Sequence, residues 1–497
     1  MTHERSPLRM MVDLLSTCAR HVAQIAAGLV TVALVVRMLG PESLGAWTVL
    51  GTTGFLLGLS DLGLSVVVQR TAARPDDDAT RQILRLTVLV VTVVCPCLGA
   101  GAYALLLQLP SATEALRADI ARAALPVLAA GWAGSLASPF RSFLLMRGAF
   151  TALAWARATA AAIQVGLTVV LLITSRSLFG PAMGVLMGSV AELLLLAVAS
   201  RRMDPHVDFR PGWPADKARV RDAFREGAGA LAMNIGVAAA VRADVFILTT
   251  AASLSMVGAY QVASRAVEQI LASGKLLSGW LLHRLGNPER RADALRLGTA
   301  VMGALVSSGV IALAFDGTAL LEAWVGGLAH ERVTALAVGL LGMAAIIAAS
   351  EEVASVTLTV SGATPWDVAN PVMLGHALNV AVSVLGVGYA GVWAVAGGTV
   401  CGNALIAVMV WRKLGALLQW RFRDVLRTLA PAGAAGLVAL AAGWGLAPLA
   451  ARGPLVSALI CSLVTLLGTG TALLLWWRGK ASLAASASVP PASASLR

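Results

Sequence analysis

Four polar side chains could line one wall of a cavity beside a membrane helix. They are Gln261, Arg265, Glu268 and Lys275, all within an apolar stretch that covers residues 253–282. At roughly 100° per residue they lie at about −40°, 0°, −60° and −80° relative to Arg265, so they share one face. Lipid cannot solvate such a face, so it must border water or protein. Arginine there can hold a phosphate through two hydrogen bonds, unless Arg265 and Glu268 neutralise each other.

Three further arginines are candidates for the same cavity. Arg20 lies in the first two turns of the first apolar stretch, and it either lines the cavity beside Gln24 or reaches back to the membrane surface. Arg37 ends that stretch and either contributes to the site or anchors the helix end. Arg242 stands two residues before Asp244, about 200° around a helix, so the two cannot both face one cavity.

Ionisable groups inside apolar stretches are candidates for ion coupling. They are Asp61, Glu192, Asp244, Glu351, Glu352 and His376. A carboxylate in apolar surroundings binds protons more tightly, which suits coupling to H⁺, and Na⁺ is the alternative ion. Glu351 and Glu352 point about 100° apart, so at most one need be central. A single histidine such as His376 is more often a packing residue than a proton relay.

Three of these carboxylates also have structural interpretations. Asp61 could satisfy backbone groups at a helix irregularity, which the following Gly63 predicts. Glu192 could balance Arg157 from the neighbouring helix. Asp244 could cap or pair near the end of its helix. The sequence shows no metal-ligand spacing, so neither a metal nor an organic cofactor is expected.

The composition of the whole chain is that of an integral membrane protein. Hydrophobic residues make up 58% and charged residues 13% of the 497 residues, and the mean hydropathy is +0.80. About fourteen runs are long enough to cross the bilayer as helices, each needing roughly 20 residues. The runs are continuously apolar rather than alternating, which predicts an all-α fold. They cover 14–36, 44–68, 86–108, 120–142, 151–174, 178–199, 226–249, 253–282, 296–315, 333–360, 366–386, 390–411, 429–449 and 455–477.

Basic residues are distributed unequally between the two sides of these spans. If the N-terminus is cytoplasmic, 28 of the 38 Lys and Arg residues fall on that side, which is the bias typical of cytoplasmic loops. We therefore expect both chain ends in the cytoplasm and the chain in a bacterial inner membrane. The net charge of +12 follows from these loops and their attraction to anionic membrane lipids, so no nucleic-acid partner is expected.

An internal repeat divides most of the chain into two halves. The tetrapeptide 44–47 (LGAW) opens the second span, and the similar tetrapeptide 257–260 (VGAY) opens the eighth, 213 residues later. Each half contains an even number of spans, six, so the two repeats have parallel topology. The predicted parts are an N-terminal lobe (1–205), a cytoplasmic linker loop (206–225), a C-terminal lobe (226–413), two extra helices (414–478) and a disordered tail (479–497).

Four short motifs resemble those of polysaccharide (O-antigen type) flippases in the multidrug/oligosaccharidyl-lipid/polysaccharide exporter superfamily. They are RMLGPESLGAW at 37–47, DLGL at 61–64, ADVFIL at 243–248 and VGAYQVASR at 257–265. The resemblance implies two six-helix lobes in a V around a central cationic cavity, which opens alternately to the two membrane faces. It also implies a substrate, an isoprenoid-pyrophosphate-linked oligosaccharide moved to the outer leaflet for surface or exo-polysaccharide assembly, including lipopolysaccharide.

Three other functions stay open from the sequence. A flippase for the peptidoglycan lipid precursor would share the superfamily and the number of spans. A multidrug or cation exchanger predicts acidic rather than cationic cavity walls and usually about twelve spans. A membrane scaffold without transport activity would support glycan assembly beside a polysaccharide polymerase and glycosyltransferases, which are also the expected partners of a flippase. An enzyme is not expected, because the sequence has no phosphate-binding loop and no nucleophile–base set.

Overall fold

Every regular element is a helix in the part of the chain that the structure, a computed structural model, describes. The described residues are 7–72, 77–107, 113–207, 210–214, 216–286, 288–361, 363 and 365–487. The chain divides into two compact units. Unit 1 comprises residues 1–262 and 383–395, and unit 2 comprises residues 263–382 and 396–497.

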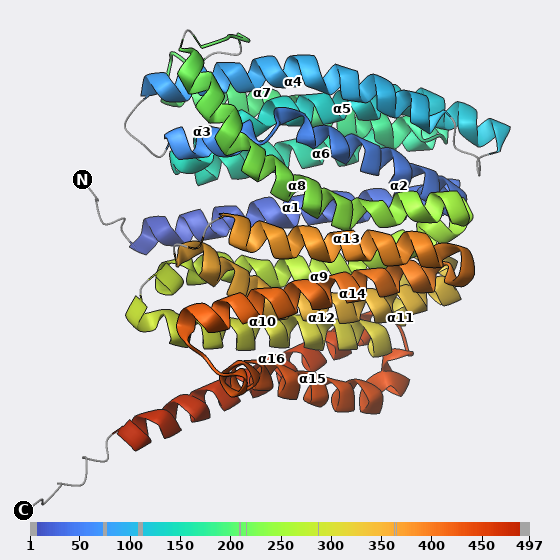
Figure 1. The fold of residues 1–497 in the computed structure, drawn as a ribbon. Coiled ribbons are helices and arrows are strands. Elements are labelled where there is room, and N and C mark those ends of the chain that lie inside the picture. Colours follow the sequence, from blue (N-terminus) through green and yellow to red (C-terminus); the bar gives the residue numbers. More distant parts are fainter. Residues whose placement is uncertain are drawn as a thin grey trace, which may run out of the picture. The chain divides into compact units, whose positions relative to one another are not determined.

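Unit 1 contains the first eight α-helices and the start of α9 (Figure 1). Its helices are α1 (Pro7–Leu39), α2 (Pro41–Leu56), the 3-10 helix η1 (Leu57–Asp61), α3 (Leu64–Ala72), α4 (Asp77–Leu106), α5 (Glu114–Met146), α6 (Phe150–Ser175), α7 (Phe179–Met203) and α8 (Lys217–Ala251). Helices α3 to α8 together form its hydrophobic core, which surrounds the buried rings of Phe140 and Phe143. The second predicted span is therefore a broken helix made of α2, η1 and α3.

Except for residues 383–395 at the end of α13 and the start of α14, unit 2 contains most of α9 and the helices that follow. They are α9 (Leu254–Gly286), α10 (Pro288–Asp316), α11 (Thr318–Val325), the 3-10 helix η2 (Gly326–His330), α12 (Arg332–Val360), α13 (Pro365–Ala390), α14 (Val392–Leu418), α15 (Phe422–Ala450) and α16 (Pro454–Ala487). Helix α10 packs against α12, α15 and α16. Small side chains at this contact, among them Ala304, Ala435 and Ala472, allow the helices to approach closely.

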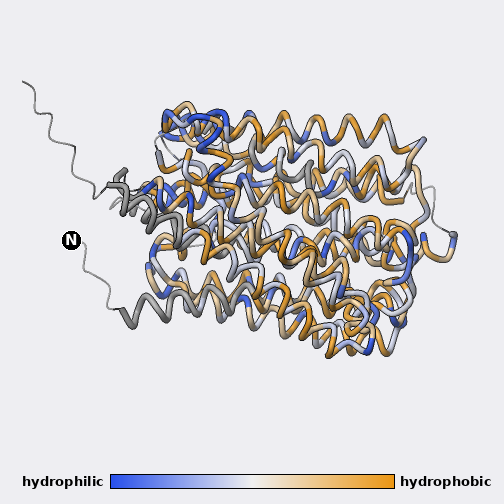
Figure 2. The backbone as a smooth tube through the Cα atoms, turned by 90° about the horizontal axis from the view of Figure 1, so that it is seen from below, coloured by the Kyte–Doolittle hydropathy of each residue, from blue (hydrophilic) through white to orange (hydrophobic). Residues whose placement is uncertain are grey.

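Twelve helices in the described part of the chain are long and apolar enough to cross a membrane. They are α1, α2 with η1, α4, α5, α6, α7, α10, α12, α13, α14, α15 and α16. Helices α8 and α9 are not among them, but with 35 and 33 residues both exceed the length that a span needs. Hydrophobic residues dominate along the helices, and hydrophilic residues gather mostly near the helix ends (Figure 2). The prediction of an all-helical, many-span membrane protein is confirmed.

Proline and capping residues define where many of these helices begin. Helices α2, α10 and α16 start at Pro41, Pro288 and Pro454, where a missing N–H costs nothing because the first turn has no acceptor for it. The side chain of Asp216 accepts a hydrogen bond of 2.8 Å from the backbone N–H of Ala218 and so caps α8. The boundaries thus follow from local sequence.

Helices α6 and α7 pack closely because α7 presents glycine at every fourth position. A Cβ atom on Gly184 would lie 2.2 Å from the hydroxyl of Thr168, and one on Gly188 would lie 2.9 Å from the carbonyl oxygen of Ala160. A Cβ on Gly180 would lie 2.9 Å from the backbone nitrogen of Leu172. No larger residue fits this stripe without separating the helices, as in other membrane contacts between small residues.

The two repeat tetrapeptides meet at the starts of α2 and α9. A Cβ on Gly45 would lie 2.0 Å from the carbonyl oxygen of Leu254, and a Cβ on Gly258 would lie 2.7 Å from the carbonyl oxygen of Pro41. Gly45 and Gly258 are equivalent in the repeat, and so are Pro41 and Leu254. The contact is therefore reciprocal, which is the pattern that a local two-fold relationship produces.

Candidate functional site

The second span is broken at the position of Asp61. Its side chain, 5% exposed, accepts a hydrogen bond of 2.9 Å from the backbone N–H of Gly63. Leu62 and Gly63 adopt positive φ angles of 50° and 77°, so the helix cannot continue through them. A Cβ on Gly63 would lie 2.2 Å from the carbonyl oxygen of Gly227 in α8. Asp61 therefore accepts a backbone hydrogen bond at the break beside which α8 packs.

Arg242 and Asp244 contact different partners although they are two residues apart on α8. The guanidinium of Arg242 lies 4.7 Å from the centroid of the Phe55 ring, which is a cation–π contact with α2. Asp244 is 5% exposed and accepts a hydrogen bond of 2.6 Å from the hydroxyl of Tyr260 at the start of α9. Arg242 is thus stacked on an aromatic ring, and Asp244 joins α8 to α9.

Glu192 of α7 receives two arginines inside unit 1. Arg141 of α5 donates to one carboxylate oxygen at 2.8 Å, and Arg157 of α6 donates to the other at 2.7 Å. The side chain of Glu192 is 8% exposed, whereas those of Arg141 and Arg157 are 38% and 26% exposed. One carboxylate balances only one guanidinium, so the group keeps one net positive charge that is partly accessible.

The polar residues of α9 divide into a buried amide and a partly exposed ion pair. Gln261 is 4% exposed. Arg265 lies 3.3 Å from Glu268, and the hydroxyl of Ser264 donates a hydrogen bond of 3.0 Å to the same carboxylate. About a third of each charged side chain is exposed. The side chain of Lys275, the fourth member of the predicted face, lies outside the described residues.

Arg20 and Arg37 are the two candidate site arginines that belong to α1. Arg37 is in the last turn and is exposed, where a positive charge also interacts favourably with the helix dipole. The side chain of Arg20 lies outside the described residues. Gln24, one turn further on, is exposed.

The remaining ion-coupling candidates belong to α12 and α13 in unit 2. Glu351 and Glu352 are partly buried, and the hydroxyl of Ser355 donates a hydrogen bond of 2.6 Å to Glu351. His376 is also partly buried. Asn379, one turn after it, is 1% exposed and accepts a hydrogen bond of 3.4 Å from Thr399 of α14. Glu351 thus has a partner on its own helix and Asn379 one on a neighbouring helix, and the described residues show no cluster of three or more acidic, His or Cys side chains here.

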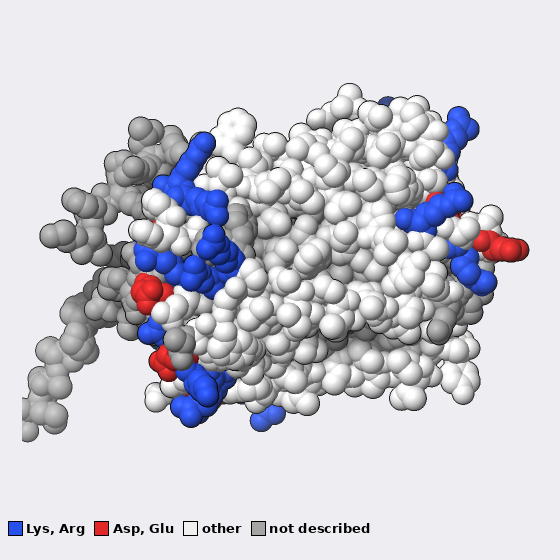
Figure 3. Space-filling model, turned by 90° about the horizontal axis from the view of Figure 1, so that it is seen from above, with Lys and Arg blue, Asp and Glu red and all other residues white. Residues whose placement is uncertain are grey.

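Charged side chains gather at the ends of the helices. On the face seen in Figure 3, Lys and Arg lie at two opposite ends, and the broad surface between them carries neither basic nor acidic residues. Such an uncharged belt is what a hydrocarbon layer requires. Basic residues of the loops therefore stay outside the apolar belt on this face.

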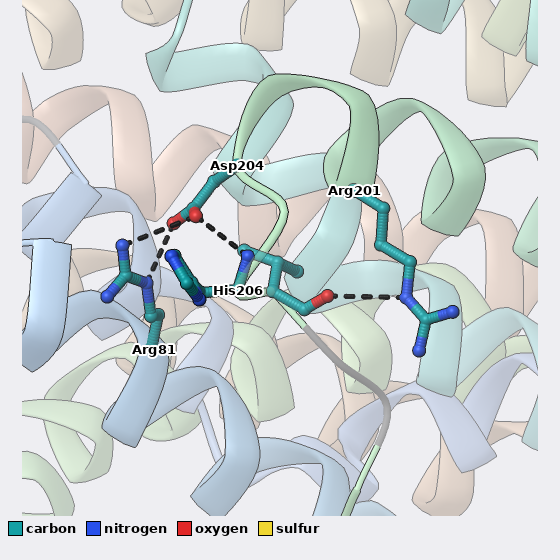
Figure 4. A network of polar contacts seen from close by, with 5 residues as sticks. Arg81, Arg201, Asp204 and His206 are labelled. Carbon is teal, nitrogen blue, oxygen red and sulfur yellow. Dashed lines mark hydrogen bonds and ion pairs between the residues drawn. The ribbon is translucent and has the colours of Figure 1, made fainter.

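A polar network joins the start of α4 to the segment that follows α7. Arg81 donates hydrogen bonds of 2.8 and 3.3 Å to the two oxygens of Asp204, and Arg201 donates to the carbonyl oxygen of Val207 at 3.4 Å (Figure 4). Burial opposes ionisation of Asp204, but the hydrogen bonds from Arg81 and from the backbone N–H of His206 outweigh it and hold the pKa of this carboxyl below its usual value. The network fixes the start of the predicted linker.

Sequence reasoning missed Arg141 and Tyr260. From the sequence, Arg141 at the end of the run 120–142 is only one of the basic residues of the cytoplasmic side, yet α5 continues to Met146 and Arg141 pairs with Glu192 of α7. The first glycine after the run is Gly148, and this absence of an earlier helix terminator was the available signal. Tyr260 belongs to the repeat tetrapeptide, but nothing local indicates that its hydroxyl binds Asp244.

Comparison with known proteins gives the family. The polysaccharide biosynthesis protein family matches residues 13–273, which is more than half of the chain. This chain belongs to that family. The match in the polysaccharide biosynthesis protein family includes the broken second span, the Glu192 group and the start of α9. Among curated proteins, none matches the chain significantly.

Solved structures show which fold this polysaccharide biosynthesis protein has. The lipid II flippase MurJ in an inward closed conformation aligns with a TM-score of 0.70 at 14% identity, over 92% of this chain and 98% of that chain. An inward-facing multidrug resistance MATE family transporter of the MOP superfamily aligns with a TM-score of 0.63 at 16% identity, over 81% and 99%. The Vibrio cholerae MATE transporter VcmN aligns with a TM-score of 0.58 at 15% identity, over 84% and 98%.

These likenesses confirm the predicted superfamily fold. The three proteins are a flippase and two transporters, and at 14–16% identity they show the fold of this chain alone. The V-shaped arrangement of two lobes around a cavity and the division at residues 205 and 226 stay predictions, as do the roles of the individual site residues.

Proposed function

We propose that this chain is a flippase that moves an isoprenoid-pyrophosphate-linked oligosaccharide from the inner to the outer leaflet of a bacterial cytoplasmic membrane. The observation that carries the proposal is the Arg141–Glu192–Arg157 group, which keeps one positive charge inside an apolar bundle. Such a charge favours an anion, and pyrophosphate is the anionic part of this substrate. The sugar head is too strongly hydrated to cross hydrocarbon unaided, whereas the isoprenoid tail can remain in lipid.

The polar face of α9 would bind the same head group at a later stage of transport. Arg265 can exchange Glu268 for a phosphate oxygen because their pair is only partly buried. Gln261 supplies an amide for sugar hydroxyls, and Lys275 a further charge. Arg20, Arg37 and Arg242 are the additional candidate contacts. This assignment extends the binding face predicted from the sequence. It rests on the positive charge of the Glu192 group in unit 1 and on that of Arg265 in unit 2.

The transport cycle would alternate access between the two membrane faces and couple to H⁺ or Na⁺. Asp61, Asp244, Glu192, Glu351, Glu352 and His376 are the candidate coupling groups. Among them, Asp61 and Glu192 already have partners that favour a structural role. Both chain ends would lie in the cytoplasm, next to the glycosyltransferases that make the substrate, and a polysaccharide polymerase would use the product outside.

A reconstitution assay tests the proposal. Purified chain is placed in liposomes that contain a fluorescent isoprenoid-pyrophosphate oligosaccharide, and flipping is measured by quenching from outside. Arg141→Ala leaves the Arg157–Glu192 pair neutral, so we expect normal insertion and at least a tenfold slower rate, while Arg141→Lys retains part of it. The control is Arg221→Ala, because that side chain is 79% exposed. Full transport by correctly inserted Arg141→Ala and Arg265→Ala variants would show that the binding role is wrong.

A second candidate is a flippase for the peptidoglycan lipid precursor. It is favoured by the alignment with the lipid II flippase MurJ, which covers 92% of this chain. The same liposomes prepared with lipid II distinguish the two substrates, since both lipids carry a pyrophosphate but differ in their sugars. Rescue of cells depleted of their cell-wall flippase would favour lipid II. Failure to rescue, with flipping of the oligosaccharide lipid, would favour the first proposal.

Two remaining functions have distinct outcomes in these assays. A multidrug or cation exchanger, as the fold shared with MATE transporters allows, would carry cationic drugs in the absence of any lipid-linked sugar. A scaffold for glycan assembly would flip neither lipid in liposomes, yet its deletion would disrupt the assembly of the surface polysaccharide. The cationic group around Glu192 disfavours a cationic cargo because like charges repel.

A further inference from the structure

The last residue of α10 is a buried carboxylate that has no hydrogen-bond partner among the described residues. Asp316 is 2% exposed, and neither of its carboxylate oxygens has a hydrogen-bond partner in the described part of the chain. Other buried carboxylates in the described residues behave differently: Asp61, Glu192 and Asp244 each accept at least one hydrogen bond. Buried polar groups normally have hydrogen-bond partners, so the exception at Asp316 indicates a bound species that the positions of the heavy atoms do not reveal.

The surroundings of Asp316 are apolar and closely packed. The carboxylate points to α15, where a Cβ on Gly443 would lie 3.2 Å from its Oδ2 atom. Nearby, Ala312 of α10, Ala439 of α15 and Val464 of α16 belong to one buried cluster. Among the described residues, no group of three or more His, Cys, Asp or Glu side chains gathers here, so the site does not suit a metal ion, which needs several ligands. A proton, in contrast, needs only one oxygen atom to bind.

In the described part of the chain, no positive charge pairs with the carboxylate. The ionisable groups near this end of α10 are Cys461 of α16, Glu322 of α11, His330 of η2, Glu331 and Arg332 at the start of α12, and Arg452 of the turn before α16. Those of α15, Arg423, Asp424 and Arg427, lie in its first turns, far along the helix from Gly443. Glu322 pairs with His330 at 3.3 Å, and Cys461 donates to the carbonyl oxygen of Ala312 at 3.5 Å. Among the described residues, none of these groups forms an ion pair or hydrogen bond with the Asp316 carboxylate. The negative end of the α10 dipole also disfavours an anion there.

The backbone at the same position ties α16 to α10. The hydroxyl of Ser457 donates a hydrogen bond to the main-chain oxygen of Asp316. The contact between α10, α15 and α16 therefore closes around the carboxyl group, so its ionisation would place an unpaired charge in the middle of that contact.

We propose that Asp316 is a proton-binding site whose proton is held while α15 and α16 pack against α10. Releasing the proton leaves a buried anion without a partner, which loosens the packing of the two extra helices. Proton occupancy and helix packing are therefore linked, because each favours the other. The inference does not depend on the proposed substrate, since it concerns the fold of unit 2.

Thermal unfolding of the full chain in detergent tests the proton. Between about pH 5 and about pH 9 we expect the wild-type midpoint to fall as pH rises, because ionised Asp316 destabilises the folded state. Asp316→Asn and Asp316→Val cannot ionise and should lose that fall. Glu331→Gln, which removes an exposed carboxylate at the start of α12, should keep it. Equal pH dependence of the wild type and both Asp316 variants would overturn the proposal.

The alternative occupant is a bound cation, and a salt series distinguishes it. Replacing NaCl by choline chloride at constant ionic strength should leave the wild-type midpoint unchanged if Asp316 carries a proton. A Na⁺-dependent rise that Asp316→Asn abolishes would instead show a cation site and overturn the proposal.

The loosening of the helices has its own readout. Cys461 is partly buried against α10, so it can report separation of α16 in a chain whose other four cysteines are replaced by serine. We expect maleimide to label Cys461 several-fold faster at high pH than at low pH, after correction for the reactivity of a free thiol. Adding Asp316→Asn should abolish this increase. An increase of the same size in the Asn variant would contradict the link between protonation and packing.

Discussion

The hydroxyl of Tyr260 donates a hydrogen bond of 2.6 Å to Asp244 and so ties the start of α9 to the end of α8. Both side chains are buried, with 2% and 5% exposure. Tyr260 is also the last residue of a repeat tetrapeptide that packs against the start of α2. The Tyr260–Asp244 hydrogen bond therefore lies beside the contact between the two repeat tetrapeptides. It also fixes the side chain of Asp244, which is a coupling candidate.

Tyr260→Phe should remove this bond while keeping the ring. Asp244 loses a donor in a buried site, so we expect a loss of roughly 1–2 kcal/mol in the free energy of unfolding. The measurement is the thermal-unfolding midpoint of the purified chain. If Asp244 also carries the coupling ion, the same variant shifts the pH dependence of lipid flipping, whereas a purely structural role leaves that profile in place.

The Glu192 group predicts unequal effects for its three members. Glu192→Gln leaves two guanidiniums without their shared anion, so we expect it to cost about 3 kcal/mol or more. Arg141→Ala should cost much less, because Arg157 still pairs with Glu192. The measurement is the free energy of unfolding of the Glu192→Gln and Arg141→Ala variants and of the variant that combines them. Equal losses for Glu192→Gln and Arg141→Ala would contradict the shared pairing.

The glycine stripe of α7 predicts a steric effect. Gly184→Ala brings a methyl group against Thr168 and the backbone of Gln164, so we expect a loss of about 1–3 kcal/mol and a lower yield of folded protein. Gly166→Ala on α6 is the matched control, because a Cβ there meets nothing within 4 Å and alanine is the better helix former. Size-exclusion profiles and unfolding midpoints should separate the two variants.

The Arg81–Asp204 contact predicts a pH effect at acid pH. The pKa of Asp204 is lower in the folded chain than in the unfolded one, where it is about 3.9. Its contribution to stability is therefore present above the unfolded pKa and is lost as pH falls through the folded pKa. Asp204→Asn should remove that part of the acid sensitivity, measured as the change in unfolding midpoint below about pH 5. An unchanged acid profile would show that the contact contributes nothing.

Much of the fold follows from the sequence because hydrocarbon imposes a local rule. Backbone groups in lipid must bond within their own segment, so each apolar run of sufficient length predicts a helix. The positions of Pro41 and Gly63 further predict where a helix begins and where one breaks. The repeat tetrapeptides identify equivalent helices, because the same local sequence starts both α2 and α9.

The partners of the charged groups were decided only by the tertiary structure. Arg81 and Asp204 are 123 residues apart, and Arg141 and Glu192 are 51 apart, and each pairing depends on the rotation and register of packed helices. The hydropathy of the sequence carries no information on the rotation or the register of the helices. Asp316 illustrates this point: in the sequence it is one acidic residue just beyond an apolar run, but α15 and α16 cover it completely. The sequence determined which segments enter the membrane, and the packing of α10, α15 and α16 determined that this carboxyl has no hydrogen-bond partner within the described part of the chain.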